Sequence, residues 1–531
     1  MKIKIKDKNM TVVGFARSGI GAANLLSELG ANVTVTDIKT EEELKDFIPR
    51  LGPSVRLALG GHPEDIFLSS DMIVVSPGVP LDISPISKAK EKVIPIIGEL
   101  ELAYQIISSK FKVQSSKLGG KRRFLAITGT NGKSTTTALL GFMMKKGGFQ
   151  TIVGGNLGNA LTEEILKQVK SQKSKVRPPT CPPLLRGEFV GGGSLNSELN
   201  LSIDYIVAEV SSFQLESIKD FRPGVATILN ITPDHLDRYL SFEEYGLAKA
   251  RIFKNQGEGD FLVLNWDDPA VMKVKSEKLE VKSEKPRIFY FSRREKVEGL
   301  YSKNGMVYCN LPPMTGTVLI PPQPPFIKGG LSAGKSGTVP SLTPCPFPLI
   351  RADEIKIKGV HNLENAMAAS AMALLAGCPV EAVIDSLREF SGLEHRLEFV
   401  RELDGVSYFN DSKGTNVGAV IKSLETFSEP IILIAGGRDK AGDFSLLRQL
   451  VGEKVKSLIL IGEAGEKIRK ALGDLAATVM AKDLKEAVEM SRSIAIKGDV
   501  VLLSPACASF DMFVNFEARG RQFKKLVAET G

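Results

Sequence analysis

The stretch Ile127-Thr-Gly-Thr-Asn-Gly-Lys-Ser-Thr135 decides the fold of the chain around it. A short apolar run, RFLAI, ends at Ile127, and a helical stretch starts close to Lys133. Strand, glycine loop and helix therefore stand in the order that a phosphate-binding loop requires. Gly129 and Gly132 let the backbone approach phosphate oxygens, and the N–H groups at the start of the helix point toward them. This order predicts a site for the phosphates of ATP.

Two side chains of the loop have chemistry that fits this prediction. Lys133 is placed to bridge the β- and γ-phosphates, and the hydroxyl of Ser134 to hold Mg²⁺. The general pattern asks for a glycine five residues before Gly132, where this chain has Ile127, so the loop is a variant. A glycine-rich turn with an exposed lysine is the alternative. The predicted ATP-binding residues of the loop are Gly129, Thr130, Asn131, Gly132, Lys133, Ser134 and Thr135.

Composition excludes several classes of protein. With 531 residues, 43% of them hydrophobic, the chain can bury several cores, and its length suggests three or four domains. No apolar run resembles a signal peptide or approaches the about 20 residues of a membrane span. Five cysteines without a Cys-x-x-Cys pair fit a reducing cytoplasm. The net charge of +8 is spread along the chain without an aromatic-rich basic stripe. We expect a cytoplasmic monomer that binds small anions, not nucleic acid.

The first block, residues 1–98, has a Rossmann-like opening. TVVGFARSGIGAANLLSELGANVTVTD predicts a strand, a glycine turn, a helix and a second strand that ends at Asp37. The dinucleotide fingerprint asks for three glycines; Gly14 and Gly19 fit, but Ala16 occupies the middle position. A nicotinamide cofactor is therefore disfavoured. A nucleotide diphosphate at the helix N-terminus stays possible.

The second block, residues 99–391, contains the phosphate loop and two more strand ends with polar residues. IDYIVAEV predicts a buried strand with Glu209 near its carboxyl end, and ATILNITPDH leads from another strand to His235. Ligands gather at that edge of a parallel sheet, so Glu209 is a candidate Mg²⁺ ligand, with a solvated glutamate as the alternative. Lys249 lies in the helical segment FEEYGLAKARIF, where a surface lysine is the simpler interpretation.

The third block, residues 392–531, alternates strands with helices and predicts a parallel, doubly wound sheet. Polar loops follow three of these strands: Asp411-Ser-Lys413-Gly-Thr415-Asn, Gly436-Gly-Arg-Asp-Lys440 and Ser504-Pro-Ala-Cys-Ala-Ser509. Polar groups at several strand ends favour a binding site there. We thus expect an α/β protein with a Rossmann-like domain, a central phosphate-loop domain with a mixed or parallel sheet, and a Rossmann-like C-terminal domain.

Two Pro/Gly-rich stretches interrupt the central block, at about 175–200 and 321–348. They share a theme, PPLLRG in one and PPFIKGG in the other. Such composition cannot bury enough apolar surface to offset the entropy of ordering. We interpret both as flexible surface loops, and their shared theme as a repeated insertion in preference to a duplicated binding site.

Motifs along the whole chain, apart from these two stretches, resemble the Mur ligases of peptidoglycan synthesis. They are TGTNGKST, AEVSSFQLE, NITPDHLDR, GVHNLENA, EHR, NDSKGTN and SPACASFDMFVNFEARG. NDSKGTN and the SPACAS segment are the more specific ones and favour the members that add D-glutamate. Several others also occur in folylpolyglutamate synthases, which would lack the first block.

The resemblance implies a reaction. ATP would phosphorylate the carboxylate of UDP-N-acetylmuramoyl-L-alanine, and the amine of D-glutamate would then attack the acyl phosphate. The catalytic residues would be Lys133, Glu209, His235 and Lys249. Ser134 and Glu209 would hold one Mg²⁺, and His235 and Lys249 the other, the lysine as a carbamate.

It also implies binding residues outside the loop. For ATP these are Asn362, Asn365, Arg396 and Asp411. For the uridine nucleotide they are Ala16, Arg17, Asp37, Ser76, Gly78 and Asn156. For D-glutamate they are Thr415, Lys440, Ser509 and Phe516. Arg438 and Ala441, beside Lys440, differ from some family members.

Two rival functions stay open. A ligase of the same superfamily could add another amino acid; the diaminopimelate-adding members carry an Asp-Asn-Pro-Arg motif, which this sequence lacks. A nucleotide-binding regulator could keep the fold without catalysis, but it would have little reason to retain Lys133, Glu209, His235 and Lys249 together.

Overall fold

The computed structural model describes residues 3–110, 124–156, 158–176, 203–235, 238–279, 285–312, 346–439 and 442–529. The two Pro/Gly-rich stretches fall almost wholly outside these ranges, although a helix continues to Val176 and a strand begins at Phe347. The chain forms two compact units, Met1–Ala352 with Glu364–Ser386, and Asp353–Leu363 with Leu387–Gly531. No helix in the described part of the chain is both long and apolar enough to span a membrane.

A five-stranded parallel sheet opens the first unit, in the order β3-β2-β1-β4-β5. Its strands are β1 (Asn9–Val13), β2 (Asn32–Asp37), β3 (Arg56–Leu59), β4 (Met72–Val75) and β5 (Ile96–Gly98). Its helices are α1 (Arg17–Glu28), α2 (Glu41–Leu44), α3 (Glu64–Leu68), α4 (Ser84–Glu91) and α5 (Glu99–Lys110), with the 3₁₀ turn η1 (Ile48–Arg50). Gly19 allows the close approach of α1 to the turn after β1, because a Cβ there would lie 1.9 Å from the Gly14 carbonyl oxygen.

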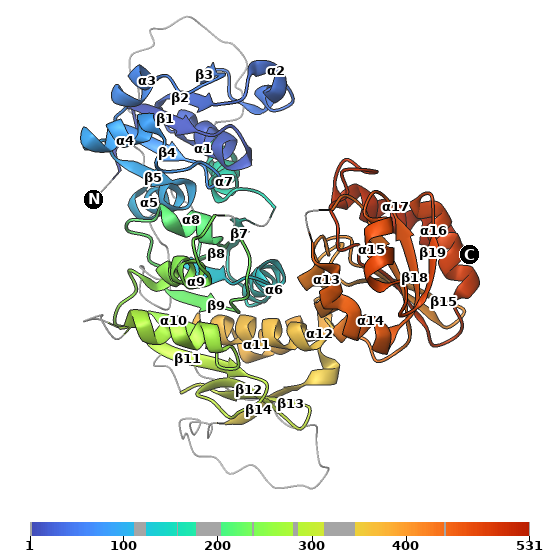
Figure 1. Cartoon of the computed structure of the whole chain (residues 1–531). Coiled ribbons are helices and arrows are strands. Elements are labelled where there is room, and N and C mark those ends of the chain that lie inside the picture. The colour runs from blue at the N-terminus through green and yellow to red at the C-terminus, as the bar shows by residue number, and fades with distance from the viewer. Residues whose placement is uncertain are drawn as a thin grey trace, which may run out of the picture. The chain divides into compact units, whose positions relative to one another are not determined.

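The second sheet of this unit has nine strands, in the order β14-β13-β12-β11-β10-β9-β6-β8-β7 (Figure 1). The pairs from β7 to β12 are parallel, and β13 and β14 add an antiparallel edge. β6, β8 and β10 are buried along their whole length, as expected for parallel strands covered on both faces. The sheet is thus mixed, as predicted.

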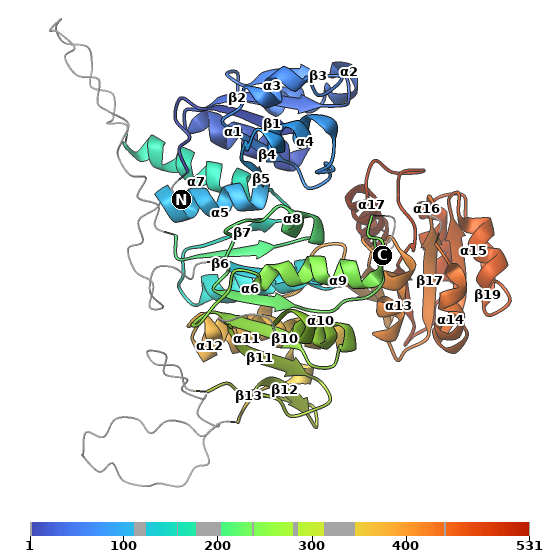
Figure 2. The same cartoon turned by 60° about the vertical axis from the view of Figure 1, so that its left-hand side comes forward.

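The strands of this second sheet are β6 (Phe124–Thr128), β7 (Thr151–Gly155), β8 (Tyr205–Glu209), β9 (Val225–Ile228), β10 (Phe261–Asn265), β11 (Arg287–Ser292), β12 (Gly299–Lys303), β13 (Met306–Asn310) and β14 (Phe347–Arg351). The helices that follow in sequence are α6 (Lys133–Lys146), α7 (Leu161–Val176), α8 (Ser212–Glu216), α9 (Phe242–Ala250), α10 (Pro269–Leu279), α11 (Val360–Leu375) and α12 (Val380–Glu389), with η2 (Arg251–Phe253) and η3 (Ala352–Glu354). Figure 2 shows α7 and α5 beside each other, between the two sheets of the unit.

The second unit is built on a six-stranded sheet, in the order β15-β16-β20-β17-β18-β19. Its strands are β15 (Glu398–Leu403), β16 (Val406–Asn410), β17 (Ile431–Gly436), β18 (Val455–Ile461), β19 (Ala477–Met480) and β20 (Val500–Leu503). Its helices are α13 (Val417–Glu425), α14 (Arg448–Lys454), α15 (Gly465–Leu472), α16 (Leu484–Ile494) and α17 (Phe516–Glu529), with η4 (Phe444–Leu447). Separate apolar clusters cover its two faces, which confirms the doubly wound prediction. The edge strand β15 is antiparallel, because Asp404 and Gly405 turn the chain back as a hairpin onto β16.

Candidate active site

The loop between β6 and α6 has the backbone that its glycines were predicted to allow. Gly129 and Gly132 have φ values of 151° and 82°, a region that other residues rarely adopt. A Cβ at Gly132 would lie 2.2 Å from Oδ1 of Asn365, and that oxygen also accepts a hydrogen bond of 3.2 Å from Thr136 Oγ1. Asn365 therefore packs against the loop, although 229 residues separate it from Thr136.

A second segment fixes the loop from the end of β9. The Asn131 amide donates to Asn230 Oδ1 at 2.8 Å, and Asn230 Nδ2 donates to the Asn131 carbonyl at 3.1 Å. Thr130 Oγ1 donates to the Thr232 carbonyl at 3.1 Å and accepts from the Thr232 amide at 3.0 Å. Asn230 and Thr232 were not predicted as site residues, although both lie in the motif NITPDHLDR quoted above.

Lys133 and Lys249 meet at the same carbonyl of the loop. Lys133 Nζ donates to the carbonyls of Gly129 and Thr130 at 2.8 and 2.7 Å, and Lys249 Nζ donates to that of Gly129 at 2.9 Å. Lys249 is only 1% exposed, so the surface-lysine interpretation of this residue is wrong. Burial, reinforced by the Lys133 cation, holds the pKa of Lys249 well below its ordinary value, against the opposing effect of Asp234. Its amine is thus easily deprotonated.

Glu209 ends β8 as predicted, but it is buried, which excludes the solvated-glutamate alternative. Its Oε1 accepts a 3.0 Å hydrogen bond from Asn156 Nδ2. Among the described residues its Oε2 has no hydrogen-bond partner although it is buried. The hydrogen bond between Asn156 and Glu209 requires a close approach of the two backbones at Gly155. A Cβ at Gly155 would lie 2.3 Å from the Glu209 carbonyl oxygen. An unpaired buried carboxylate oxygen is costly, and a cation would satisfy it.

His235 lies at the end of the NITPDH segment with a left-handed backbone, φ 53°. Its Nε2 is 3.5 Å from Oδ2 of Asp234, and its ring packs edge-on against Phe213, with the ring centroids 4.9 Å apart. The ring of Tyr245 lies beside both His235, at 6.2 Å between ring centroids, and Lys249 Nζ, at 4.3 Å from the centroid of the Tyr245 ring. His235 and Lys249 therefore border the same aromatic ring. No group of three or more His, Cys, Asp or Glu side chains in the described ranges forms a ready-made metal site.

The residues predicted for the uridine nucleotide gather at the carboxyl ends of β1, β2 and β4. Asp37 Oδ2 accepts from the Phe15 amide at 2.6 Å, and Ser76 Oγ donates to the Gly14 carbonyl at 3.0 Å. Arg17 Nη1 reaches the Gly158 carbonyl, in the loop that also carries Asn156, at 2.9 Å. The remaining predicted positions, Ala16 and Gly78, are exposed beside this turn. Strand ends and the N-terminus of α1 thus converge there, which is the usual place for a nucleotide.

In the second unit, Asp411 is buried directly after β16. Its Oδ2 accepts hydrogen bonds from the hydroxyls of Ser423 and Ser504, both at 2.7 Å, and its Oδ1 accepts one from the Leu397 amide at 3.3 Å. Burial raises the pKa of Asp411 to about 6 in spite of these hydrogen bonds and the nearby charge of Arg396. Asn362 also belongs to this unit and donates to the Lys358 carbonyl at 2.7 Å. The ATP contacts expected of Asn362, Arg396 and Asp411 stay predictions.

The residues predicted for D-glutamate lie in the loops after β16 and β20 and at the start of α17. Ser509 is buried, Thr415 is half-buried, and Phe516 lies under the ammonium of Lys413, 3.8 Å from its ring centroid. A bridge between Arg438 and Ala508 joins the loops after β17 and β20. Lys440 lies outside the described residues, so its contacts stay a prediction.

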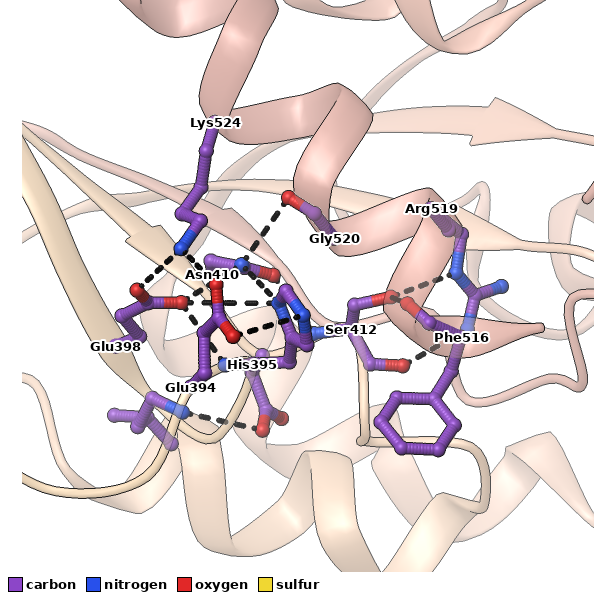
Figure 3. A network of polar contacts seen from close by, with 11 residues as sticks. Glu394, His395, Glu398, Asn410, Ser412, Phe516, Arg519, Gly520 and Lys524 are labelled. Carbon is purple, nitrogen blue, oxygen red and sulfur yellow. Dashed lines mark hydrogen bonds and ion pairs between the residues drawn. The ribbon is translucent and has the colours of Figure 1, made fainter. Parts of the chain in front are cut away.

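Two buried groups fasten these loops to α17 and were not predicted (Figure 3). Arg519 is 1% exposed and donates to Ser412 Oγ and to the carbonyls of Ser412 and Cys507, at 3.0 to 3.2 Å. His395 accepts from Asn410 Nδ2 at its Nδ1, 2.9 Å away, and a Cβ at Gly520 would lie 2.3 Å from that nitrogen. Both residues lie in motifs quoted above, EHR and FEARG, but only the folded chain shows what they contact.

A second layer of charge surrounds this histidine. Lys524 on α17 donates to Glu394 and Glu398, and Glu398 Oε2 accepts from the His395 amide at 2.9 Å (Figure 3). Burial lowers the pKa of His395, and the two glutamates act in the opposite direction. The network therefore holds the segment before β15 against α17 within the second unit.

Comparison with known proteins agrees with this geometry. Three family descriptions match the chain: the MurD-like N-terminal domain of Mur ligases at residues 8–98, the Mur ligase middle domain at 127–308, and the Mur ligase glutamate ligase domain at 395–507. The chain belongs to the Mur ligase family, whose members are ATP-dependent ligases.

Individual relatives within this family share one name. The chain is 42% identical to proteins named UDP-N-acetylmuramoylalanine–D-glutamate ligase from Citrifermentans bemidjiense and Geotalea daltonii, in each case over 99% of this chain and 98% of the relative. A protein of the same name from Caldanaerobacter subterraneus subsp. tengcongensis is 38% identical over 99% of both chains.

Solved structures show the same fold at low sequence identity. A pseudomurein peptide ligase type C from Methanothermus fervidus matches with a TM-score of 0.52 at 18% identity, over 99% of this chain and all of the other. The UDP-N-acetylmuramate-alanine ligase MurC from Thermotoga maritima matches with a TM-score of 0.52 at 16% identity and the same coverage. The MurF ligase from Thermotoga maritima, solved with ADP, matches with a TM-score of 0.52 at 15% identity, over 94% of this chain and 96% of that one.

Proposed function

We propose that this chain joins D-glutamate to UDP-N-acetylmuramoyl-L-alanine at the cost of one ATP, a step in the synthesis of peptidoglycan precursors. The observation that carries the proposal is the cluster around the phosphate loop. There Lys133, the buried Glu209 with its unpaired oxygen and the buried Lys249 come from three separate elements. Full-length relatives that bear this enzyme's name, at 42% identity, support the choice of acceptor.

The reaction has two steps. In the first, an oxygen of the L-alanine carboxylate attacks the γ-phosphorus of ATP, the bond to the β-phosphate oxygen breaks, and ADP leaves. In the second, the amine of D-glutamate attacks the carbonyl carbon of the acyl phosphate. Inorganic phosphate leaves, the amide bond forms, and the amine loses a proton. Two anions must approach each other in the first step, so positive charge at the phosphates is the main requirement.

Lys133 supplies part of that charge. Its ammonium already lies at the loop, held by the carbonyls of Gly129 and Thr130. A γ-phosphate would be a stronger acceptor than these neutral carbonyls, because its negative charge attracts the ammonium directly. The backbone N–H groups at the start of α6 would hold the other phosphate oxygens.

The buried, unpaired Oε2 of Glu209 supports one Mg²⁺ ion at the loop, and the family resemblance implies a second. The Ser134 hydroxyl and Glu209 Oε2 would contact one of them, with water and phosphate oxygens completing an oxygen-rich shell. His235 and Lys249 would contact the other. An ammonium cannot bind a cation, but the low pKa of Lys249 favours the neutral amine, which is the form that combines with CO₂ to give a carbamate. Bound Mg²⁺ would neutralise phosphate charge and align the transfer.

The two substrates would bind at the strand ends described above. The uridine diphosphate would lie at the N-terminus of α1, near Arg17, Asp37 and Ser76, and Asn156 would reach it from the loop after β7. D-glutamate would be held by Lys440, Thr415 and Ser509, a cation and two hydroxyls suited to its carboxylates, with Phe516 beside them.

The test is a panel of acceptors. The protein is incubated with ATP and UDP-N-acetylmuramoyl-L-alanine, and phosphate release is measured after addition of D-glutamate, L-glutamate, meso-diaminopimelate or L-lysine. Release that depends on D-glutamate supports the proposal. Release with diaminopimelate or lysine but not with D-glutamate would favour a different amino-acid ligase, and no release with any acceptor would favour a non-catalytic role.

A further inference from the structure

Helix α5 carries two buried carboxylates in its first turn that the chemistry above does not use. Glu99 is 2% exposed and Glu101 is fully buried. The helix starts directly after β5, the edge strand of the first sheet, and so connects that sheet to the domain with the phosphate loop. Burying two carboxylates is costly unless each is hydrogen-bonded, so their partners reveal what holds this connection together.

Glu99 caps the start of α7 from outside that helix. Its Oε1 accepts hydrogen bonds from the backbone amide and the hydroxyl of Thr162, both at 2.8 Å. The Ala160 carbonyl accepts the first helical hydrogen bonds, from Glu163 and Glu164, but alanine has no side-chain acceptor for the free amides of the first turn. Glu99 supplies that acceptor, across 63 residues of sequence.

The same end of α7 packs against α1, the helix whose N-terminus belongs to the predicted uridine-nucleotide site. A Cβ at Gly21 of α1 would lie 2.7 Å from Thr162 Oγ1, so the two helices are in close contact at this threonine. Figure 1 shows α1 and α7 side by side. Because the N-terminus of α1 forms part of the predicted nucleotide site, Glu99 and Thr162 link α5 to the helix that would hold the diphosphate.

Glu101 holds the segment that follows Glu209. Its two oxygens accept from the backbone amides of Lys219, Asp220 and Phe221, at 2.8 to 3.1 Å, and from Gln105 Nε2 at 2.8 Å. That turn comes just after α8, the short helix that begins three residues beyond Glu209. A Cβ at Gly98 would lie 2.0 Å from Oγ of Ser217, which ends α8, so β5 also packs closely on this segment.

We infer that Glu99 and Glu101 are positioning residues that set the place of the uridine-nucleotide domain relative to Glu209. They would thereby fix the distance between the substrate carboxylate and the γ-phosphate. The inference rests on the proposed function, because it assumes that the first block binds the uridine nucleotide. Geometry of this kind has large kinetic effects, since a misplacement of 1 Å can cost about 10²-fold in rate.

The two glutamates should respond differently to the same substitution. Burial raises the pKa of Glu99, against the opposing hydrogen bonds from Thr162, which favours the uncharged carboxyl. Glutamine has nearly the same shape and keeps an acceptor for Thr162, so Glu99→Gln should be tolerated where Glu99→Ala is not. Glu101 acts as the acceptor in its hydrogen bonds to Gln105 and to the turn at 219–221, so the amide N–H₂ of Glu101→Gln would face other donors and disrupt the turn.

The experiment compares these variants in the full-length protein. Steady-state kinetics give kcat and the KM for each substrate, and nucleotide binding is measured separately by titration with ADP. Positional isotope exchange in ATP, with the uridine substrate present and D-glutamate absent, reports the first chemical step alone. Glu163→Gln is the matched control, because it removes a half-buried carboxylate from the same first turn of α7.

Glu99→Ala and Glu101→Gln should lower kcat/KM for the uridine substrate and the isotope exchange by about 10-fold or more, with ADP affinity within about twofold of wild type. Glu99→Gln and Glu163→Gln should stay within about threefold of wild type in all three measurements. If Glu101→Gln fails to fold, the contrast between Glu99→Ala and Glu99→Gln still tests whether Glu99 positions the uridine-nucleotide domain.

Wild-type exchange in Glu99→Ala would overturn the inference. So would a parallel loss of exchange, ADP binding and folded fraction, because that pattern indicates a merely structural role. Failure of the proposed function looks different: the wild-type protein itself would then give no isotope exchange with the uridine substrate, or no product with D-glutamate.

Discussion

Replacing Asp411 by asparagine should stabilise the second unit at neutral pH. Burial raises the pKa of this carboxyl from an ordinary 3.8 to about 6. The folded state therefore holds the proton more tightly than the unfolded chain, and the resulting stability is present below pH 3.8 and lost as the pH rises through 6. The difference of about two pKa units corresponds to about 3 kcal/mol at pH 7 and above.

Asparagine avoids this loss because it carries no charge at any of these pH values. Its carbonyl can still accept from the Leu397 amide, and its N–H₂ can donate to the hydroxyl oxygens of Ser423 and Ser504, which now donate to Asp411. The advantage of Asp411→Asn should grow between about pH 4 and pH 6 and then level off. The same variant should lose activity if Asp411 contacts ATP, a trade of function for stability.

Hydrogen exchange followed by mass spectrometry measures this effect in the intact protein. Peptides from β16 and β20 report opening of the second unit, after correction for the intrinsic dependence of exchange on pH. The single tryptophan, Trp266, belongs to the first unit, so its fluorescence is an internal control that should not change. An advantage that is the same at pH 5 and pH 8, or a loss of stability at pH 8, would refute the reasoning.

Three further predictions concern the site and the Pro/Gly-rich stretches. Lys133→Ala should lower turnover by about 10²-fold or more, with folding preserved, because it removes charge that stabilises phosphoryl transfer; near-normal turnover would exclude that role. Lys249→Ala should be nearly inactive and be partly rescued by short-chain carboxylic acids that supply the missing oxygens; a variant with normal activity would exclude the carbamate. Deleting about residues 176–198, or 321–346, and closing each gap with a short Gly/Ser linker should leave activity largely intact, because loop length costs little; inactive but folded deletion variants would give these stretches a role in a site.

Local sequence order was sufficient to predict the strands and helices that carry the site. The phosphate loop is continuous in sequence, so its strand, its two left-handed glycines and its helix could all be expected from residues 124–146. Glu209 followed from a buried strand with one charged residue at its end. In each case the sequence signal lies within one short continuous stretch, where backbone preferences and hydrophobic periodicity act.

Contacts between distant segments could not be predicted in the same way. The sequence around Lys249 reads as a surface helix, and only packing of α9 against the phosphate loop shows that this lysine is buried. Glu99 and Thr162 are 63 residues apart, and no periodicity connects a strand end to the start of a later helix. The antiparallel edge strand β15 was missed for a related reason: the pairing of a hairpin strand with the sheet is decided by tertiary contacts.

The central claim is that the acceptor is D-glutamate, and its most direct test is the mass of the product. The protein is incubated with ATP, UDP-N-acetylmuramoyl-L-alanine and either D- or L-glutamate, and the uridine nucleotides are analysed by mass spectrometry. We predict that the nucleotide gains one glutamyl residue with D-glutamate and almost none with L-glutamate, which has the same charges but misplaces its amine. Lys440→Ala should raise the KM for D-glutamate far more than that for ATP, because the lost charge-assisted hydrogen bond is worth about 1.5–3 kcal/mol. Equal product from both enantiomers, or a Lys440→Ala defect confined to ATP, would contradict the assignment of D-glutamate.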